Sequence, residues 1–279
     1  MSRMKKIILT SGFLLLAVML SGVEAFAQQI GMVSHYFYKP MIYNPAYAGS
    51  EDGTNIMLIN HTQWSGFKGA PRLNIFTIDK NFMDKKVGLG LGLISDRKGI
   101  NNRIGGSLFY SYKLSLNENM HLSLGISFGV INQSLDYSKA VVENTSDATL
   151  FSDSKSKTAY DGNAGMAFTW KGLELGAAVP QIFGNKIKYT DNFTIHSSYA
   201  QARHYIGSVK YKFFISPDKG ISVAPQGLAR YVPNAPFQYD ANINLNWNNK
   251  FRIGATYKSN YAVAANVGFC IHKQFSVGY

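Results

Sequence analysis

Strict alternation of apolar and polar residues runs through long stretches of this chain, and it restricts the fold more than any other feature. In HLSLGISFGV, residues 121–130, every second residue is apolar and the residues between are small or polar. QYDANINLNWNN, residues 238–249, alternates apolar residues with aspartate and asparagine in the same way. A period of two over about ten residues is typical of a tilted strand that crosses a bilayer, with one face toward lipid and the other toward water.

The first residues indicate an exported protein. Residues 1–27 combine a basic start, an apolar stretch and the sequence AFA, which is the pattern of a Sec signal peptide cleaved after Ala27. The apolar stretch is short for a membrane-spanning helix, and no later run approaches about 18 apolar residues. Cys270 is the only cysteine, so we expect no disulfide framework. An exported chain with 14% aromatic residues and 26 glycines suggests an outer-membrane location.

The charge pattern argues against one class of partner. The net charge is +12, but lysines and arginines are spread along the chain and form no cluster. Nucleic-acid-binding arms concentrate such residues in one patch, so we expect no nucleic-acid partner.

We predict an all-β fold, a transmembrane outer-membrane β-barrel with antiparallel up-and-down strands. Barrels of this kind have an even number of strands, and the final FSVGY ends in mid-pattern. We therefore expect about fourteen strands, of which the last is missing from this chain. Residues 28–53 are predicted to form an N-terminal periplasmic or lumenal arm, and residues 54–279 the barrel. The strands are predicted at 54–63, 71–80, 87–95, 103–115, 120–137, 158–170, 173–181, 204–215, 220–231, 237–247, 251–258, 261–271 and 274–279.

The connections between these strands alternate in length. Short turns such as NFMDKK, NEN and KG alternate with longer connections, which include the loops predicted at 138–157 and 182–203. Outer-membrane barrels have short periplasmic turns and long external loops. This alternation places the N-terminus in the periplasm and the two long loops at the cell surface. The connection at 259–260 is short and breaks the rule.

The chain carries little that suggests catalysis or cofactor binding. GISFG, residues 125–129, matches the G-x-S-x-G hydrolase pattern, but Ser127 lies inside the cleanest predicted strand and not at a strand-to-helix turn. The GLGLG run lacks phosphate-loop spacing, and its glycines are predicted to smooth an inner strand face. The histidines at 35, 61, 121, 196, 204 and 272 show no metal-ligand spacing. We predict no catalytic, cofactor-binding or metal-binding residues.

Two short irregular stretches stand apart from the strands. YNPAYAGS contains an Asn-Pro turn starter and a glycine suited to a positive φ, and QWSGFKGAP forms the first loop. Both could do no more than seal the barrel, as a compact arm and a hairpin loop. The other interpretation is a plug or a partner contact. Its candidate residues are Tyr43, Asn44, Pro45, Ala46, Tyr47, Ala48 and Gly49 in the first stretch, and Gln63, Trp64, Gly66, Gly69, Ala70 and Pro71 in the second.

The first stretch is predicted to avoid the lipid. Irregular backbone carries unpaired polar groups, which cost several kcal/mol each in hydrocarbon. We therefore expect it in the periplasm or in the lumen, folded against the inner wall through Tyr43 and Tyr47.

At these two stretches the chain resembles the PorP/SprF-like outer-membrane proteins of the type IX secretion system of Bacteroidota. The match rests on VSHYFYKPMIYNPAYAGS, residues 33–50, together with QWSGFKGAP, residues 63–71. A looser barrel-like pattern extends it over most of the mature chain. Two features depart from the family: His61 stands where the family usually has arginine, and the family's closing segment is lacking.

The resemblance implies a non-catalytic barrel without cofactors. Such a protein would bind the C-terminal domain of a secreted adhesin or other type IX cargo and assist its export or its anchoring at the surface, as in gliding motility. The implied partners are outer-membrane lipid, the cargo domain and periplasmic type IX secretion components. The alternative is a porin-like channel for small polar or anionic solutes, favoured by the asparagines and lysines expected on the inner face. A hydrolase that uses Ser127 ranks third.

Overall fold

The structure is a computed structural model that describes residues 36–67, 69–136, 155–189, 197–248, 250–259, 262–272 and 275–279. Two short 3-10 helices precede a series of strands. Among the described residues no helix is long and apolar enough to cross a membrane. In chain order the elements are η1 Pro40–Ile42, η2 Pro45–Tyr47, β1 Thr54–Thr62, β2 Arg72–Phe82, β3 Val87–Lys98, β4 Asn101–Asn117, β5 Met120–Leu135, β6 Lys155–Trp170, β7 Leu173–Val179, β8 Lys186–Tyr189, β9 Ser197–Ala200, β10 Tyr205–Tyr211, β11 Phe213–Ser216, β12 Ile221–Tyr231, β13 Gln238–Trp247, β14 Phe251–Lys258, β15 Ala262–His272 and β16 Phe275–Gly278.

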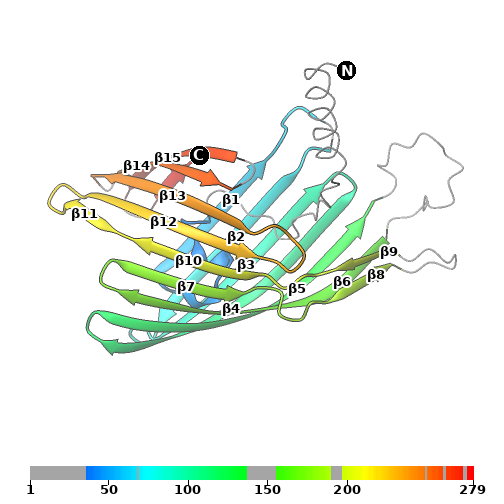
Figure 1. The fold of residues 1–279 in the computed structure, drawn as a ribbon, viewed down its shortest axis with the longest axis horizontal. Helices are drawn as coiled ribbons and strands as arrows, with labels where there is room; N and C mark the ends of the chain where they lie inside the picture. The colour runs from blue at the N-terminus through cyan, green and yellow to red at the C-terminus, as the bar shows by residue number, and fades with distance from the viewer. Residues whose placement is uncertain are drawn as a thin grey trace, which may run out of the picture.

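The strands form one large antiparallel sheet of 14 strands that curls around an interior, here called the lumen (Figure 1). Its order follows the sequence from β1 to β7 and continues through β10, β12, β13, β14 and β15 to β16, with β11 paired beside β12. The predicted all-β, antiparallel, up-and-down arrangement is thereby confirmed. The predicted strand 204–215 is divided at Lys212 into β10 and β11. No pairing joins β1 to β16 among the described residues, so the sheet is not closed.

The long connection predicted at 182–203 contains a hairpin that the sequence did not indicate. Within this range β8 and β9 pair as a separate two-stranded sheet, with Lys186 opposite Ala200 and Tyr189 opposite Ser197. β7 ends at Val179, directly before Pro180, which cannot donate to a strand ladder. The last three residues of the loop predicted at 138–157 belong to β6, which begins at Lys155. Residues 137–154 lie outside the described part of the chain.

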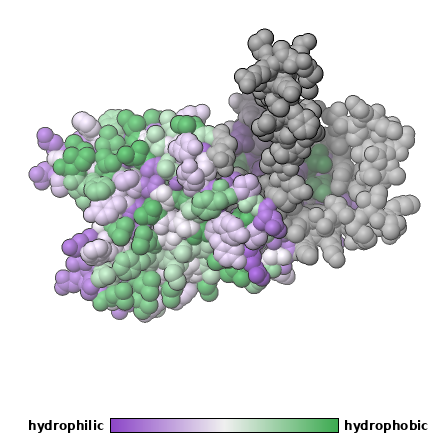
Figure 2. Space-filling view, in the orientation of Figure 1, coloured by the Kyte–Doolittle hydropathy of each residue, from purple (hydrophilic) through white to green (hydrophobic). Residues whose placement is uncertain are grey.

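The sheet carries its apolar side chains outside and its polar side chains inside. In β13, Ile243 is 52% exposed on the outer face, whereas the intervening Asn242 and Asn244 are each 4% exposed on the lumenal face. β5 shows the same alternation, with Ile126 exposed and Ser127 buried. Figure 2 shows the apolar side chains spread over the outer face of the strands. A soluble sheet would bury that face, so this sidedness is that of a sheet solvated by lipid.

Candidate functional site

Residues 36–50 form a compact segment, here called the lumenal arm. Asn44 adopts an extended conformation before Pro45, and its side chain caps η2 by accepting a hydrogen bond from the Ala46 amide at 3.0 Å. Pro45 supplies a fixed φ at the first helical position. Gly49 has φ +63°, a left-handed value that glycine adopts without strain, and it turns the chain toward β1. The NPAYAG sequence therefore encodes one capped turn followed by a reversal.

The arm lies against the inner wall through two apolar clusters. Tyr36, Phe37 and Tyr43 pack with Ala178 of β7 and Ile206 of β10, and Leu228 of β12 belongs to the same cluster. The second cluster joins Met41, Ala46, Tyr47 and Ala48 to Phe109 of β4 and Ala167 of β6. These arm residues are all buried. These wall strands lie within the run from β4 to β12 in the sheet, so the arm covers several strands instead of following a single hairpin.

A buried ion pair ties the arm to β2. Lys39 Nζ lies 2.5 Å from Asp79 Oδ1, and the two side chains are 5% and 0% exposed. Asp79 Oδ2 also accepts a hydrogen bond from the Gly49 amide at 2.8 Å. One carboxylate thus holds both ends of the arm. A buried charge pair is costly to break, because the remaining partner loses both water and its counter-ion.

Polar contacts to strands further along the sheet, β4, β6 and β7, extend this attachment. The Ser111 hydroxyl of β4 donates to the Ala48 carbonyl at 2.7 Å. Asn44 Nδ2 donates to the carbonyls of Met166 in β6 and Ala177 in β7, at 3.0 and 3.3 Å. Both acceptors are backbone carbonyls, so this contact of Asn44 does not depend on which side chains the two strands carry at these positions.

The start of the arm reaches the C-terminal strands. The Tyr38 hydroxyl donates to Asn266 Oδ1 of β15 at 2.8 Å. The Arg252 guanidinium of β14 lies 5.4 Å from the centre of the Tyr38 ring, within cation–π range. Together with the contacts to β2, β4, β6 and β7, these interactions attach the arm to strands far apart around the sheet.

Glycines of the inner wall make room for the arm. A Cβ added to Gly88 would collide with the Ala48 carbonyl, and one added to Gly125 would collide with the backbone of Pro45 and Ala46. The same test at Gly165, Gly176 and Gly90 meets Asn44, Tyr47 and Met41 respectively. In GLGLG, Gly88 and Gly90 therefore leave space for the arm, which is a more specific role than the smooth inner face predicted for them, whereas a Cβ on Gly92 would meet Phe109 of β4.

Burial controls the protonation of the arm's tyrosines. Burial strongly raises the pKa of Tyr43, and the neighbouring Tyr47 raises it further. Burial also raises the pKa of Tyr47 to about 12, against a hydrogen bond with Ser208 that lowers it. The raised pKa values keep both phenols neutral to a higher pH than an exposed tyrosine.

The second motif lies at the other end of the wall. Residues 63–71 join β1 to β2, where the Gln63 amide donates to the Pro71 carbonyl and the Gly99 amide of the β3–β4 turn donates to the Gly69 carbonyl. Gly66 and Gly69 have positive φ, and so does Trp64, at +51°. The Trp64 and Phe67 side chains are 71% and 76% exposed. Ala70 closes the loop by donating its amide to the Phe67 carbonyl.

No hydrogen bond joins the two motifs in the described part of the chain. The residues from Tyr43 to Gly49 line the lumen, whereas those from Gln63 to Pro71 form a loop tip. Lys39, Asp79 and the wall glycines are part of the lumenal site, and sequence reasoning missed them. Their signal was weak: one lysine beside the motif, one aspartate in a strand, and glycines at alternate positions.

The residues considered for catalysis have structural partners. Ser127 lies in β5, and its hydroxyl accepts a hydrogen bond from Asn163 Nδ2 at 2.6 Å. His121 Nδ1 lies 3.2 Å from the Ser115 hydroxyl, and His204 Nδ1 lies 2.8 Å from the Ala202 carbonyl. Residues 35 and 196 lie outside the described ranges. Within those ranges no three His, Cys, Asp or Glu side chains are grouped so that they could hold a metal ion.

Comparison with known proteins gives one informative match. No curated protein matches the chain. Among solved structures, the KdgM porin is similar with 10% sequence identity and a TM-score of 0.42, over 79% of this chain and 100% of that one. A Pseudomonas aeruginosa FadL homologue is similar with the same identity and TM-score, over 81% of this chain and 77% of that one. The family model described as "Type IX secretion system membrane protein PorP/SprF" matches residues 25–279. The chain therefore belongs to the PorP/SprF family of type IX secretion system membrane proteins.

Proposed function

We propose that this protein is a non-catalytic outer-membrane barrel that binds the C-terminal domain of a secreted adhesin or other type IX cargo. It assists export of that cargo or anchors it at the cell surface. Family membership supports the secretion role, and the apolar outer face supports the membrane location. The signal peptide at residues 1–27 remains part of this proposal.

The lumenal arm is the observation that carries the proposal. Its contacts reach β2, β4, β6 and β7 on one side and β14 and β15 on the other. A folded domain has no free passage through a lumen crossed in this way. The protein would therefore act on cargo at one mouth of the barrel while the arm stays docked.

The long-loop mouth offers the better surface for cargo. Trp64 and Phe67 extend from the loop tip with most of their surface exposed. Trp64 also holds a left-handed backbone conformation, which costs a bulky residue of the order of 1–3 kcal/mol. Exposed aromatic side chains on a rigid turn are good anchors for a protein partner. The arm and the short turns then face the periplasmic components of the secretion system.

Recovery of cargo on the purified barrel tests the proposal. We expect the isolated C-terminal domain of a type IX cargo to co-purify with the wild-type protein. Recovery should fall for the Trp64→Ser/Phe67→Ser variant and for a variant that lacks residues 138–153. Phe214→Ser, which removes a 62% exposed aromatic ring at the opposite end, is the matched control and should retain binding. Equal recovery by all variants would remove the long-loop mouth as the cargo site.

A conductance measurement separates this function from the porin alternative. With the arm docked, we expect almost no steady current through the wild-type protein in a planar bilayer. A large and stable open conductance would instead favour a solute channel, and the secretion proposal would then need another basis.

A further inference from the structure

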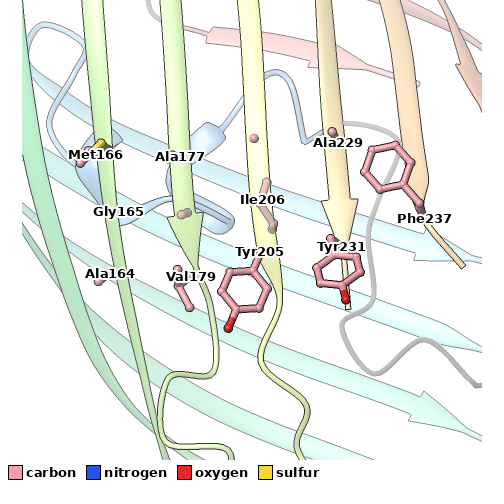
Figure 3. A pocket seen from close by; sticks show the side chains of 12 residues that line it. Ala164, Gly165, Met166, Ala177, Val179, Tyr205, Ile206, Ala229, Tyr231 and Phe237 are labelled. Atoms are coloured by element: carbon pink, nitrogen blue, oxygen red, sulfur yellow. The ribbon is translucent and has the colours of Figure 1, made fainter. Parts of the chain in front are cut away.

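The outer face of the sheet carries a hollow of about 540 Å³ across β6, β7, β10 and β12. Figure 3 shows it from close by. Its floor is formed by Ala177, Gly207 and Ala229, and its rim includes Tyr205, Tyr231 and Phe237. The floor residues are neighbours across the sheet, since Ala177 pairs with Gly207 and Gly207 with Ala229.

Among the floor residues, Gly207 does not need to be a glycine for the packing of the described residues. A Cβ added to Gly207 meets nothing within 4 Å, and this glycine is not among those with positive φ. Glycine in the middle of a strand weakens the strand, so its presence needs a reason. For the wall glycines Gly88 and Gly125 the reason is the arm, because a side chain there would collide with Ala48 or Ala46. Gly207 faces outward, and no described residue fills the space beside it.

The rim places the hollow at the edge of the apolar band. Tyr205 begins β10 and Tyr231 ends β12, and their ring centres are 6.1 Å apart. Aromatic girdles of outer-membrane barrels lie at this level, where a strand passes from hydrocarbon to headgroups. Arg203 lies at the same end, two residues before Tyr205, and is exposed. Its Nε donates to the Ile182 carbonyl at 2.8 Å. The hollow therefore begins at the interface and continues into the apolar wall.

We propose that this hollow binds one acyl chain of an outer-membrane lipid, whose headgroup lies beside Tyr205, Tyr231 and Arg203. The hollow is continuous with the lipid-facing surface, and its floor strands pair their backbone groups with one another. It thus offers almost nothing polar to a polypeptide, whereas a hydrocarbon chain needs no polar partner. The lumenal arm does not fill it, because the arm packs on the lumenal face, where the side chains of Ala178 and Ile206 are 5% and 4% exposed.

Photolabelling tests the proposal on the full-length protein. The probe is a phosphatidylglycerol with a diazirine in the middle of one acyl chain, diluted into vesicles of phosphatidylethanolamine and phosphatidylglycerol. We expect labelling to concentrate on peptides that contain β7, β10 and β12. Ala177→Leu and Gly207→Leu fill the hollow from its floor and should lower that labelling several-fold. Ala255→Leu changes an outward-facing alanine of β14 that does not line the hollow, and it should leave the labelling unchanged.

The outcomes discriminate between a lipid site and general solvation by lipid. Labelling spread around the wall in proportion to exposed area, or labelling that both filling variants leave intact, would overturn the proposal. So would a second copy of the protein that shields the hollow, detected as dimer-specific protection from the probe. The heat-dependent mobility shift of folded barrels checks that each variant is folded. The inference rests on the membrane location alone, so it survives if cargo binding fails.

Discussion

Replacing Asp79 by alanine should release the lumenal arm. The change removes the counter-ion of Lys39 and the acceptor of the Gly49 amide at once. Breaking a buried pair by removing one partner costs about 3–5 kcal/mol, because the remaining charge is left buried without compensation. Here the whole cost falls on the docked state, since an undocked arm carries Lys39 into water. At about 1.4 kcal/mol per factor of ten, the undocked fraction should rise by roughly two to three and a half orders of magnitude.

Cysteine labelling measures that fraction. The reporter is Ala48→Cys, at an arm position that is 2% exposed, in a background where Cys270, the one native cysteine, is replaced by serine. The labelling rate by a membrane-impermeant maleimide follows the undocked population, and we expect it to accelerate strongly in Asp79→Ala. Adding Lys39→Met should return the rate toward wild type, because the uncompensated charge is then gone.

Two results would refute this reasoning. Asp218→Ala removes an exposed carboxylate from a short turn and should leave the rate unchanged. If Asp79→Ala labels no faster than this control, the ion pair does not hold the arm. If the Ala48→Cys reporter labels as fast as an exposed cysteine while Asp79 is still present, the arm is not docked in the lumen at all.

Three further predictions concern the same segment. Gly125→Val should displace the arm and speed labelling, because its Cβ would collide with the backbone at Ala46; an unchanged rate would contradict the close fit. Asn44→Ala removes two hydrogen bonds to the wall and the cap of η2, and should weaken docking by about 1–3 kcal/mol, measured as the change in undocked fraction. With the pKa of Tyr47 raised to about 12, its stabilising contribution is complete below about pH 10 and is lost as pH rises toward 12. In a titration of tyrosinate absorbance, wild type and Tyr47→Phe should differ by one tyrosinate only as the pH approaches 12, and a difference already half complete at about pH 10 would count against this burial.

Much of the architecture could be predicted from the sequence because strand periodicity is a local property. Leu124 to Val130 and Tyr239 to Trp247 show which face each strand exposes without reference to any neighbour. The hairpin β8–β9 was missed because its strands have four residues each, too few for a period to be recognised. The division of the strand at Lys212 was missed because the alternation continues through it.

The candidate site could be predicted only in part. The NPAYAG stretch was recognisable as irregular, and irregular backbone belongs away from lipid. Nothing local in the sequence joins Lys39 to Asp79 or Tyr38 to Asn266, because these pairs are brought together across the lumen. The outer hollow was equally hidden, since Ala177, Gly207 and Ala229 are ordinary small residues until strand register makes them neighbours.

The sequence alone determined the class of fold, the sidedness of the wall and the two stretches that depart from the repeating pattern. It could do so because alternation, turn residues and the conformational limits of proline and glycine act over a few residues. Only the tertiary structure decided what the inner glycines accommodate, which carboxylate holds the arm, and where the outer wall is hollow. Those features depend on register and curvature, which bring together residues that lie tens to hundreds of positions apart in the chain.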